Sequence, residues 1–374
     1  MATLSTDNPP LHKQDTSSGI ILMLLIFVLA GAFSQVARSM GCVDSMVNIT
    51  LSILPPGMVM TGLFLAACVV SLSIGTSCGT IAALTPIAAG IATATGTSTP
   101  MLIAVVVGGS LFGDNLSFIS DTTIMSTKTQ GCLMKDKFWA NIRIALPAAL
   151  LTMLIYLFLG WQVTKGTEYS DFSLLHTLPY LVVLVLAVMG VGVVWVLAVG
   201  LLLASCMALL EQSMTATQLW EAAQVGVMGM HDLIVITIVA AAAMDYLRRR
   251  GVIEWLIGRM GKVISTRRGA ELSIAVAVTI ADMLTANNTI AILAVGPVAR
   301  SISYSYGIPP QRAASILDTM SCFAQGLLPW GAQLLIAAGL AQISPLEIIP
   351  YLFYPYILGA FTLRYIFLSN KKKN

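Results

Sequence analysis

The chain has 374 residues, of which 57% are apolar and only 10% are charged, and its formal net charge is +3. An ordinary soluble domain carries about 25% charged residues, so this composition excludes a water-soluble globule, a disordered chain and a nucleic-acid-binding protein. It predicts an all-α polytopic membrane protein that has the lipid bilayer as its partner. The six cysteines stand singly, and we interpret them as small buried residues, neither a metal cluster nor a disulfide framework.

Apolar runs long enough to cross a bilayer follow one another along most of the chain. The first, at 19–37, has no signal-peptide features and is expected to remain as a span. The run at 178–210 is too long for one crossing, so we divide it at 189–192 into a two-span hairpin. About 12 membrane segments are expected in total. The remaining runs are 57–75, 80–95, 101–126, 138–160, 232–247, 269–285, 289–303, 310–342 and 349–368.

The placement of the basic residues predicts the orientation, because positively charged loops remain in the cytoplasm. With about twelve crossings counted from a cytoplasmic N-terminus, every Lys and Arg except Arg38 and Lys165 falls in an inner segment or at the inner end of a span. We therefore expect an integral, multi-pass protein of the cytoplasmic membrane with both termini in the cytoplasm.

The sequence repeats itself at an offset of about 210 residues. Thr80-Ile81-Ala82 matches Thr289-Ile290-Ala291 at an offset of 209, and Phe112 matches Phe323 at an offset of 211. The orientation starts one repeat inside and the other outside, so the repeats are expected to be inverted, which is typical of secondary transporters. The expected organisation is a cytoplasmic tail at 1–18, repeat 1 at 19–160, a connector with the two-span hairpin at 161–231, repeat 2 at 232–370 and a basic tail at 371–374.

Two polar interruptions lie at matching positions of the repeats, at Gly75–Thr80 and Leu284–Thr289. Glycine and small polar residues unwind a helix and free backbone groups, which the membrane interior tolerates only beside protein or water. The freed carbonyl oxygens, with hydroxyl and amide oxygens, are hard ligands suited to a partly dehydrated cation. We interpret the pair as broken or re-entrant helices around an ion site, and tight turns or small-residue packing between helices remain the alternative.

A third polar stretch, Phe112–Thr123, carries two carboxylates within an apolar run. Asp114 and Asp121 are seven residues apart, which predicts that they share one helix face. A charged carboxylate in the membrane interior normally faces a cavity, a partner or an ion. Because a proton and a cation compete for the same carboxylate, the pair provides a minimal exchange mechanism. Carboxylates hydrogen-bonded to nearby Ser and Thr for helix packing are the alternative.

The second repeat carries less charge at the corresponding place, where Gln325 stands 211 residues after Asp114. Asp282 and Asp318 could complete the ion site or shuttle protons, but pairing with Arg312 or another basic residue is an equal alternative. We assign Na⁺ to Asp114, Asp121 and Asn287. The full set of candidate residues for binding ions and protons is Asp114, Asn115, Ser117, Ser120, Asp121, Thr122, Thr76, Ser77, Thr80, Asn287, Asn288, Asp282 and Asp318.

These motifs resemble the NhaC family of sodium/proton antiporters, within the larger ion-transporter superfamily. Gly75-Thr76-Ser77-Cys78-Gly79-Thr80 is similar to the GTSWGT-type break of the family, and Phe112 through Thr123 is similar to its FGDxxSPxSDTT motif. Cys78 replaces the usual Trp, and Phe118 replaces the usual Pro. With the later repeat, the likeness covers nearly the whole chain.

The resemblance implies a secondary transporter, not an enzyme, that exchanges Na⁺ for H⁺ by alternating access without a cofactor. Some relatives are expected to exchange small carboxylates such as malate and lactate, coupled to Na⁺ or H⁺. A carboxylate exchanger is therefore the first alternative function. The interior holds few residues for an organic anion, with Arg300 and Arg312 near the inner rim, so cation exchange ranks first. An ion channel ranks lower because inverted repeats indicate alternating access. The expected partners are transported cations, and a homodimer is one assembly the chain could form.

Overall fold

The computed structural model describes residues 15–161, 173–252 and 266–368, and every element in these ranges is helical. The helices are α1 (Asp15–Ser39), α2 (Cys42–Ile53), η1 (Pro56–Met58), α3 (Val59–Ile74), α4 (Ser77–Thr95), α5 (Thr99–Leu116), α6 (Asp121–Gln130), α7 (Met134–Trp161), α8 (Leu174–Val188), α9 (Val193–Leu210), α10 (Ala216–Met228), α11 (His231–Arg249), α13 (Arg267–Thr285), α14 (Asn288–Ser305), α15 (Pro310–Leu327), α16 (Ala332–Ala341), α17 (Pro345–Ile348), η2 (Ile349–Tyr351) and α18 (Phe353–Leu368).

Several of these helices have the length and composition of membrane spans. Within the described residues, seven helical stretches are long and apolar enough to cross a bilayer, and the bent pair Pro345–Tyr351 and Phe353–Leu368 would make an eighth. The predicted all-α polytopic membrane fold is confirmed, while the number of about 12 segments stays a prediction. The division of the long apolar run is also found, because α8 ends at Val188 and α9 begins at Val193.

The helix boundaries repeat at a spacing of 211 residues. α3 ends at Ile74 and α13 ends at Thr285, while α6 begins at Asp121 and α16 begins at Ala332. Each repeat therefore contains two interrupted helix pairs, α3/α4 and α5/α6 in the first and α13/α14 and α15/α16 in the second. The predicted broken helices are confirmed. Each repeat has two interruptions, whereas the stretches Gly75–Thr80 and Leu284–Thr289 by themselves indicate one in each repeat.

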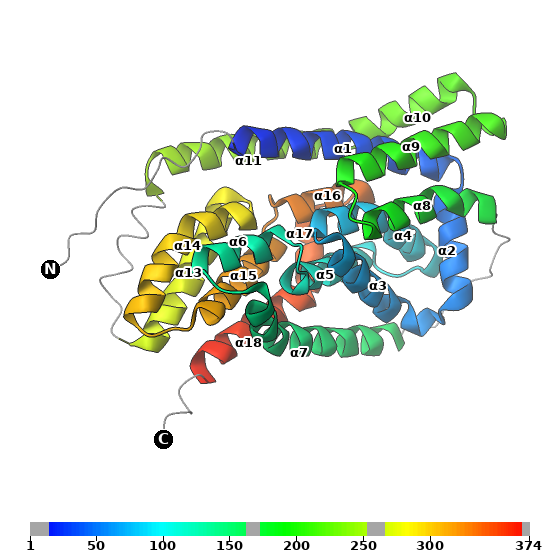
Figure 1. The fold of residues 1–374 in the computed structure, drawn as a ribbon. Coiled ribbons are helices and arrows are strands. Elements are labelled where there is room, and N and C mark those ends of the chain that lie inside the picture. Colours follow the sequence, from blue (N-terminus) through cyan, green and yellow to red (C-terminus); the bar gives the residue numbers. More distant parts are fainter. Residues whose placement is uncertain (1–14, 162–172, 253–265, 369–374) are drawn as a thin grey trace.

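The last helix of each interrupted set packs against the other repeat. α6 packs against α14 and α15, and α16 packs against α4 and α5. Figure 1 shows α6 beside the yellow helices of the second repeat and α16 close to α4. This exchange brings the interruptions of both repeats to the same region of the molecule.

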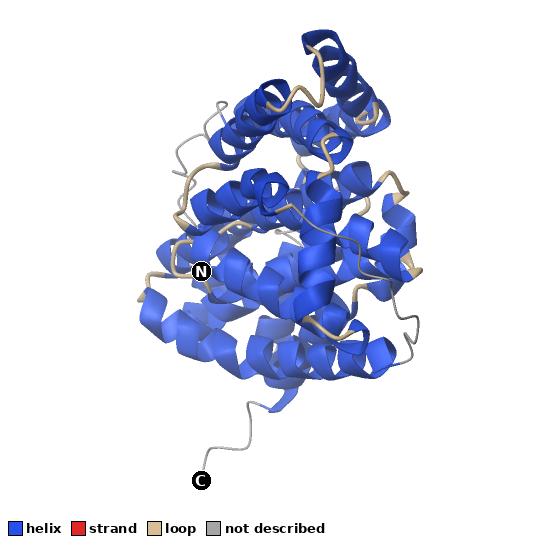
Figure 2. Cartoon of the chain, turned by 90° about the vertical axis from the view of Figure 1, so that its right-hand side faces the viewer, coloured by secondary structure: helices blue, strands red, loops and turns tan. Residues whose placement is uncertain are grey.

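The segment 211–231, expected as a connector, contains the helix α10, which packs along α1. The close approach depends on two glycines, since a Cβ atom added to Gly31 would lie 2.5 Å from the carbonyl oxygen of Gly226. Polar residues on its exposed face, such as Glu221 and Gln224, interrupt the apolar pattern, so this helix does not stand out as an apolar run in the sequence. Together with α9 and α11, α1 and α10 form a layer along one side of the molecule (Figures 1 and 2).

Candidate functional site

A cavity of about 690 Å³ lies where the interruptions of the two repeats meet. Helices α1, α9 and α11 contribute further residues to its wall. It contains all three residues that we assigned to Na⁺, Asp114, Asp121 and Asn287. The candidate residues that line it are Thr76, Ser77, Asp114, Ser120, Asp121, Thr122, Asn287 and Asn288.

The first interruption holds the carboxylate of Asp114. Gly75 ends α3 in the left-handed region, with φ +73°, and the extended residue Thr76 leads into α4. The first amide of that helix, the N–H of Ser77, donates to Oδ1 of Asp114 over 3.0 Å. Free amides and the positive end of the helix dipole both favour a negative charge at this place. The α4 N-terminus therefore stabilises a buried carboxylate at the edge of the cavity.

The second interruption separates the two carboxylates. α5 ends at Leu116 and α6 begins at Asp121, so the prediction that Asp114 and Asp121 share one helix face is wrong. Ser120 has extended backbone and starts the new helix, and Asp121 is the first helical residue, exposed to the cavity. The carboxylates still meet at one cavity, because Asp114 near the end of α5 and Asp121 at the start of α6 both line it.

The two interruptions of the first repeat also contact each other. The Ser117 hydroxyl donates to the carbonyl of Leu72 over 3.0 Å, which occupies a carbonyl group in the last turn of α3. A Cβ atom at Gly75 would lie 2.6 Å from Cγ1 of Ile119, so only glycine fits here without movement of its neighbour. The helix break occurs at this place although Phe118 replaces proline.

The interruption of α13 and α14 has the same form in the second repeat. Ala286 ends α13 in the left-handed region, with φ +49°. The side chain of Asn287 then caps α14 by accepting from the N–H of Ile290 over 3.0 Å. Gln325, the counterpart of Asp114, donates from Nε2 to the carbonyl of Ala286 over 3.2 Å. The second repeat thus supplies amide groups where the first supplies a carboxylate.

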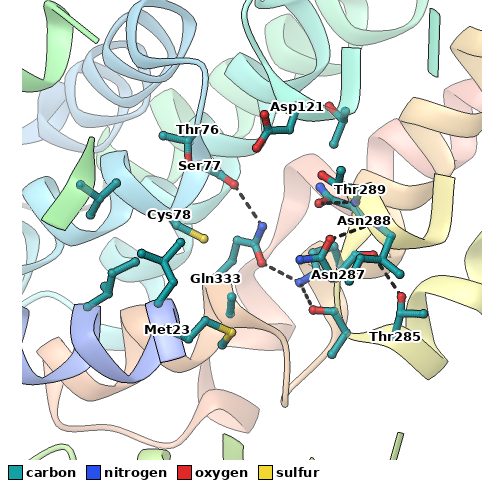
Figure 3. Close-up of a pocket in the computed structure, with 18 of the residues that line it drawn as sticks. Met23, Thr76, Ser77, Cys78, Asp121, Thr285, Asn287, Asn288, Thr289 and Gln333 are labelled. Atoms are coloured by element: carbon teal, nitrogen blue, oxygen red, sulfur yellow. Dashed lines mark hydrogen bonds between the residues drawn. The ribbon is translucent and has the colours of Figure 1, made fainter. Parts of the chain in front are cut away.

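Gln333 joins the two repeats across the cavity. Its Nε2 donates to Oγ of Ser77 over 3.1 Å, and its Oε1 accepts from Nε2 of Gln325 over 2.7 Å. Figure 3 shows Gln333 between Ser77 on one side and Asn287 on the other, with Asp121 at the rim of the same space. Sequence reasoning missed Gln333, and the signal that could have found it is its position 211 residues after Thr122.

Five candidate residues do not line the cavity. Thr80 and Ser117 bond to the backbone carbonyls of Thr76 and Leu72. Asp282 is fully buried on α13, away from the cavity lining. The structure therefore divides the candidates into a group at the cavity and a group in the surrounding helices, the second being Asn115, Ser117, Thr80, Asp282 and Asp318.

Asp318 belongs to a buried salt bridge behind the cavity. Its Oδ2 lies 2.8 Å from Nζ of Lys137, and the two side chains are 0% and 1% exposed. Lys137 and Asn141 both donate to the carbonyl of Asn115, next to Asp114, and Asn141 also donates to Asp318 over 2.6 Å. Lys137 was expected in an inner loop and is instead buried on α7, because a carboxylate and two oxygen acceptors surround its ammonium group.

The lining has few groups of the kind that hold a resident metal. In the described part of the chain, no three His, Cys, Asp or Glu side chains come together in a way that could hold a metal ion. A cation in this cavity would instead combine one or two carboxylates with neutral oxygens of Ser, Thr, Asn and Gln. Such oxygen donors are ligands of hard cations.

The chain is similar to known transport proteins over most of its length. A family model described as "Na+/H+ antiporter family" matches residues 16–161 and 171–369. The Na(+)/H(+) antiporter NhaC of Alkalihalophilus pseudofirmus is 23% identical over 377 residues, covering 92% of this chain and 82% of that protein. The malate-2H(+)/Na(+)-lactate antiporter of Bacillus subtilis is 20% identical, covering 89% and 78%. The solved structure of the YdaH transporter of Alcanivorax borkumensis, described as having an unusual topology, has a TM-score of 0.43 and 13% identity, covering 95% and 87%.

Proposed function

Because the chain belongs to the Na⁺/H⁺ antiporter family, we propose that it exchanges Na⁺ for H⁺ by alternating access at the cavity between its repeats. Na⁺ binds to Asp114, Asp121 and Asn287 after a carboxylate has released its proton. The protonated form returns without Na⁺ and completes the cycle. Cation and proton use the same carboxylates, so each excludes the other, and this exclusion couples the two movements.

The observation that carries the proposal is that one cavity joins both repeats. The carboxylates of Asp114 and Asp121 come from the first repeat, and Asn287 and Asn288 come from the second. A cation held between them contacts both repeats at once. Movement of one repeat relative to the other would then open the cavity to one side and close it to the other, as alternating access requires.

The proposed orientation places both termini in the cytoplasm and the chain in the cytoplasmic membrane. It is supported by the distribution of basic residues, of which Arg38 and Lys165 are the exceptions outside. Lys137 no longer counts toward this argument, because it is buried. Arg249, Arg267 and Arg268 still support an inner position for the end of α11 and the start of α13.

The direct test is removal of one cavity carboxylate. In proteoliposomes with an imposed Na⁺ gradient, Asp121→Asn is expected to abolish Na⁺-dependent proton movement without loss of folded protein. Asp44→Asn is the matched control, because Asp44 is exposed on α2 and away from the cavity. Undiminished exchange in Asp121→Asn would remove this carboxylate from the mechanism.

Exchange of small carboxylates is the second candidate function, favoured by the likeness to a malate-2H(+)/Na(+)-lactate antiporter. In that case labelled malate or lactate would enter the proteoliposomes in a saturable way under a Na⁺ or proton gradient. Saturable uptake of either compound would reverse the ranking of the two functions.

A further inference from the structure

We propose that the cavity also accepts an organic cation, a compact primary amine or diamine, in exchange for protons. This inference rests on the proposed function, because it uses the same carboxylates and the same alternating access. It widens the cargo from Na⁺ to ammonium groups carried on a short carbon chain. The size, the charge and the apolar wall of the cavity each support it.

The cavity is larger than Na⁺ needs. A water molecule takes about 30 Å³ in the liquid, so a sodium ion with a shell of several waters fills only part of about 690 Å³. Cavities of roughly 300–1,000 Å³ are typical of sites for small organic ligands. The space is thus sufficient for a molecule of several carbon atoms.

The charge of the lining selects a cation. Asp114, Asp121 and Asp245 line the cavity, and none of the described lining residues is Lys, Arg or His. Arg249 lies 2.7 Å from Asp245 and offsets that carboxylate, so the excess of negative charge lies at Asp114 and Asp121. An organic anion would face these two carboxylates without a basic partner, which is unfavourable in a largely apolar site.

Two buried basic residues of the surrounding helices are already paired. Lys137 is held by Asp318. Arg312 makes two bonds of 2.7 Å to Glu271, and it also donates to the carbonyl of Tyr365. Releasing Lys137 would leave the buried carboxylate of Asp318 uncompensated, and releasing Arg312 would leave that of Glu271 with only the more distant Arg267, 3.3 Å away, among its described partners. Neither side chain is therefore available for a carboxylate substrate.

Two lining residues of the described chain, Gln325 and Thr237, each have a buried side-chain oxygen without a hydrogen-bond partner. Gln325 is 1% exposed, and its Oε1 has no hydrogen-bond partner in the described part of the chain. Exchanging Oε1 and Nε2 by a flip of the side-chain amide would break two hydrogen bonds, because Nε2 donates to the carbonyl of Ala286 and to Oε1 of Gln333. An ammonium group has three N–H donors and no acceptor. It therefore complements the carboxylates of the cavity directly, and it reaches the buried Oε1 of Gln325 only if a neighbouring side chain moves.

The remaining wall suits a carbon chain. Leu22, Met23 and Ile26 of α1 face the cavity, as do Trp195 of α9 and Trp330 before α16. A sodium ion gains nothing from such a surface, whereas methylene groups gain by burial. The indole rings can also attract an ammonium group through their faces.

The experiment uses the full chain in proteoliposomes with an acidic interior. Labelled putrescine is added outside, with labelled succinate as a matched dianion of the same number of carbons, and Na⁺/H⁺ exchange is measured in the same vesicles. We expect saturable uptake of putrescine that dissipates the proton gradient, competition between putrescine and Na⁺, and no saturable uptake of succinate. Asp121→Asn should abolish putrescine uptake, and Asp44→Asn should leave it unchanged.

The outcomes separate this inference from the proposed function. Na⁺/H⁺ exchange with neither uptake of nor competition by putrescine would overturn the inference and leave the proposed function standing. Putrescine/H⁺ exchange without Na⁺/H⁺ exchange would support the inference and overturn Na⁺ as cargo. Saturable uptake of succinate, in place of putrescine, would overturn the inference in favour of an anion.

A second variant tests where the amine lies. Trp195→Ala removes an indole ring from the wall and leaves the carboxylates in place, so we expect the KM for putrescine to rise about fivefold, with a smaller change in the KM for Na⁺. Trp139→Ala is the control, because Trp139 is exposed and lies outside the lining. An unchanged KM for putrescine in Trp195→Ala would overturn the contact between the amine and this wall.

Discussion

Asp114 and Gln325 lie 211 residues apart at equivalent positions of the two repeats, and each side chain bonds to the helix interruption of its own repeat. Asp114 accepts from the first amide of α4, whereas Gln325 donates to the carbonyl of Ala286, the residue directly after α13. In the first repeat the side chain is therefore the hydrogen-bond acceptor and the backbone the donor, and in the second repeat these roles are reversed. Both repeats keep the interruption in place, but only the first brings a carboxylate to the cavity at this position.

Asp114→Asn separates the structural contact of this residue from its charge. The asparagine Oδ1 can still accept from the N–H of Ser77. We therefore expect the free energy of unfolding in detergent, measured by thermal unfolding, to stay within about 1 kcal/mol of the wild-type value. Na⁺-dependent proton movement should be lost, because an amide cannot exchange a proton for a cation. Asp114→Ala should lose exchange and also about 1–3 kcal/mol of stability, because the buried N–H is left without its acceptor. Wild-type exchange in Asp114→Asn would contradict the assignment.

Three glycines distinguish backbone strain from crowding. Gly75 and Gly190 both have positive φ, +73° and +79°, but a Cβ atom would touch Ile119 only at Gly75 and would meet nothing within 4 Å at Gly190. Gly192 has φ −58° and also has open space. We expect Gly190→Ala to lower the free energy of unfolding by about 1–2 kcal/mol and Gly75→Ala to lower it by more. Gly192→Ala should leave it nearly unchanged.

The measurement is thermal unfolding of the three variants in one detergent. The double variant Gly75→Ala/Ile119→Ala should recover the part due to crowding by the Ile119 side chain, and retain the part due to φ and to the Ile119 backbone carbon at 3.1 Å. Equal stability of Gly75→Ala and Gly190→Ala would show that the contact between the two interruptions imposes no steric demand at Gly75.

The sequence predicts the interruptions correctly where the signal is local. Glycine and small polar residues at Gly75–Thr80, and asparagines at Asn287 and Asn288, are sufficient to indicate a broken helix at membrane depth. The error at Asp114 and Asp121 has a local cause as well, because Ser120-Asp121 is a helix start signal inside an apolar run. A period count across that run treats two helices as one.

The pairing of distant residues was not predictable from a single sequence. Lys137 and Asp318 are 181 residues apart and meet because α15 packs against α7 and the exchanged helix α6. Gln333 reaches Ser77 only because α16 packs against α4. Neither contact leaves a local pattern, since both depend on how the repeats exchange their last helices.

The Lys137–Asp318 pair is expected to be structural, and removing one partner should be more harmful than removing both. Lys137→Met leaves the Asp318 carboxylate buried without its cation, which should destabilise the protein by about 3–5 kcal/mol. In Lys137→Met/Asp318→Asn the new amide oxygen can still accept from Asn141, so most of the stability should return. Lys135→Met, at an exposed neighbouring lysine, is the control.

Thermal unfolding and Na⁺/H⁺ exchange are measured on the same samples. We expect the double variant to retain exchange, because Asp318 does not line the cavity. Loss of exchange in a double variant of wild-type stability would assign Asp318 to the path of the proton instead.

Gln333→Leu tests whether the bridge between the repeats positions the cation site. The substitution keeps the approximate size of the side chain but removes the bonds to Ser77 and Gln325. Ser77 also begins α4, whose first amide holds Asp114, so loss of the bridge should loosen the carboxylate. We expect the KM for Na⁺ to rise about tenfold, the effect of roughly 1.4 kcal/mol, with a smaller change in maximal rate. Gln224→Leu, at an exposed position on α10, should change neither quantity. An equal loss of maximal rate and affinity, accompanied by lower thermal stability, would instead show that Gln333 supports the fold without positioning the site.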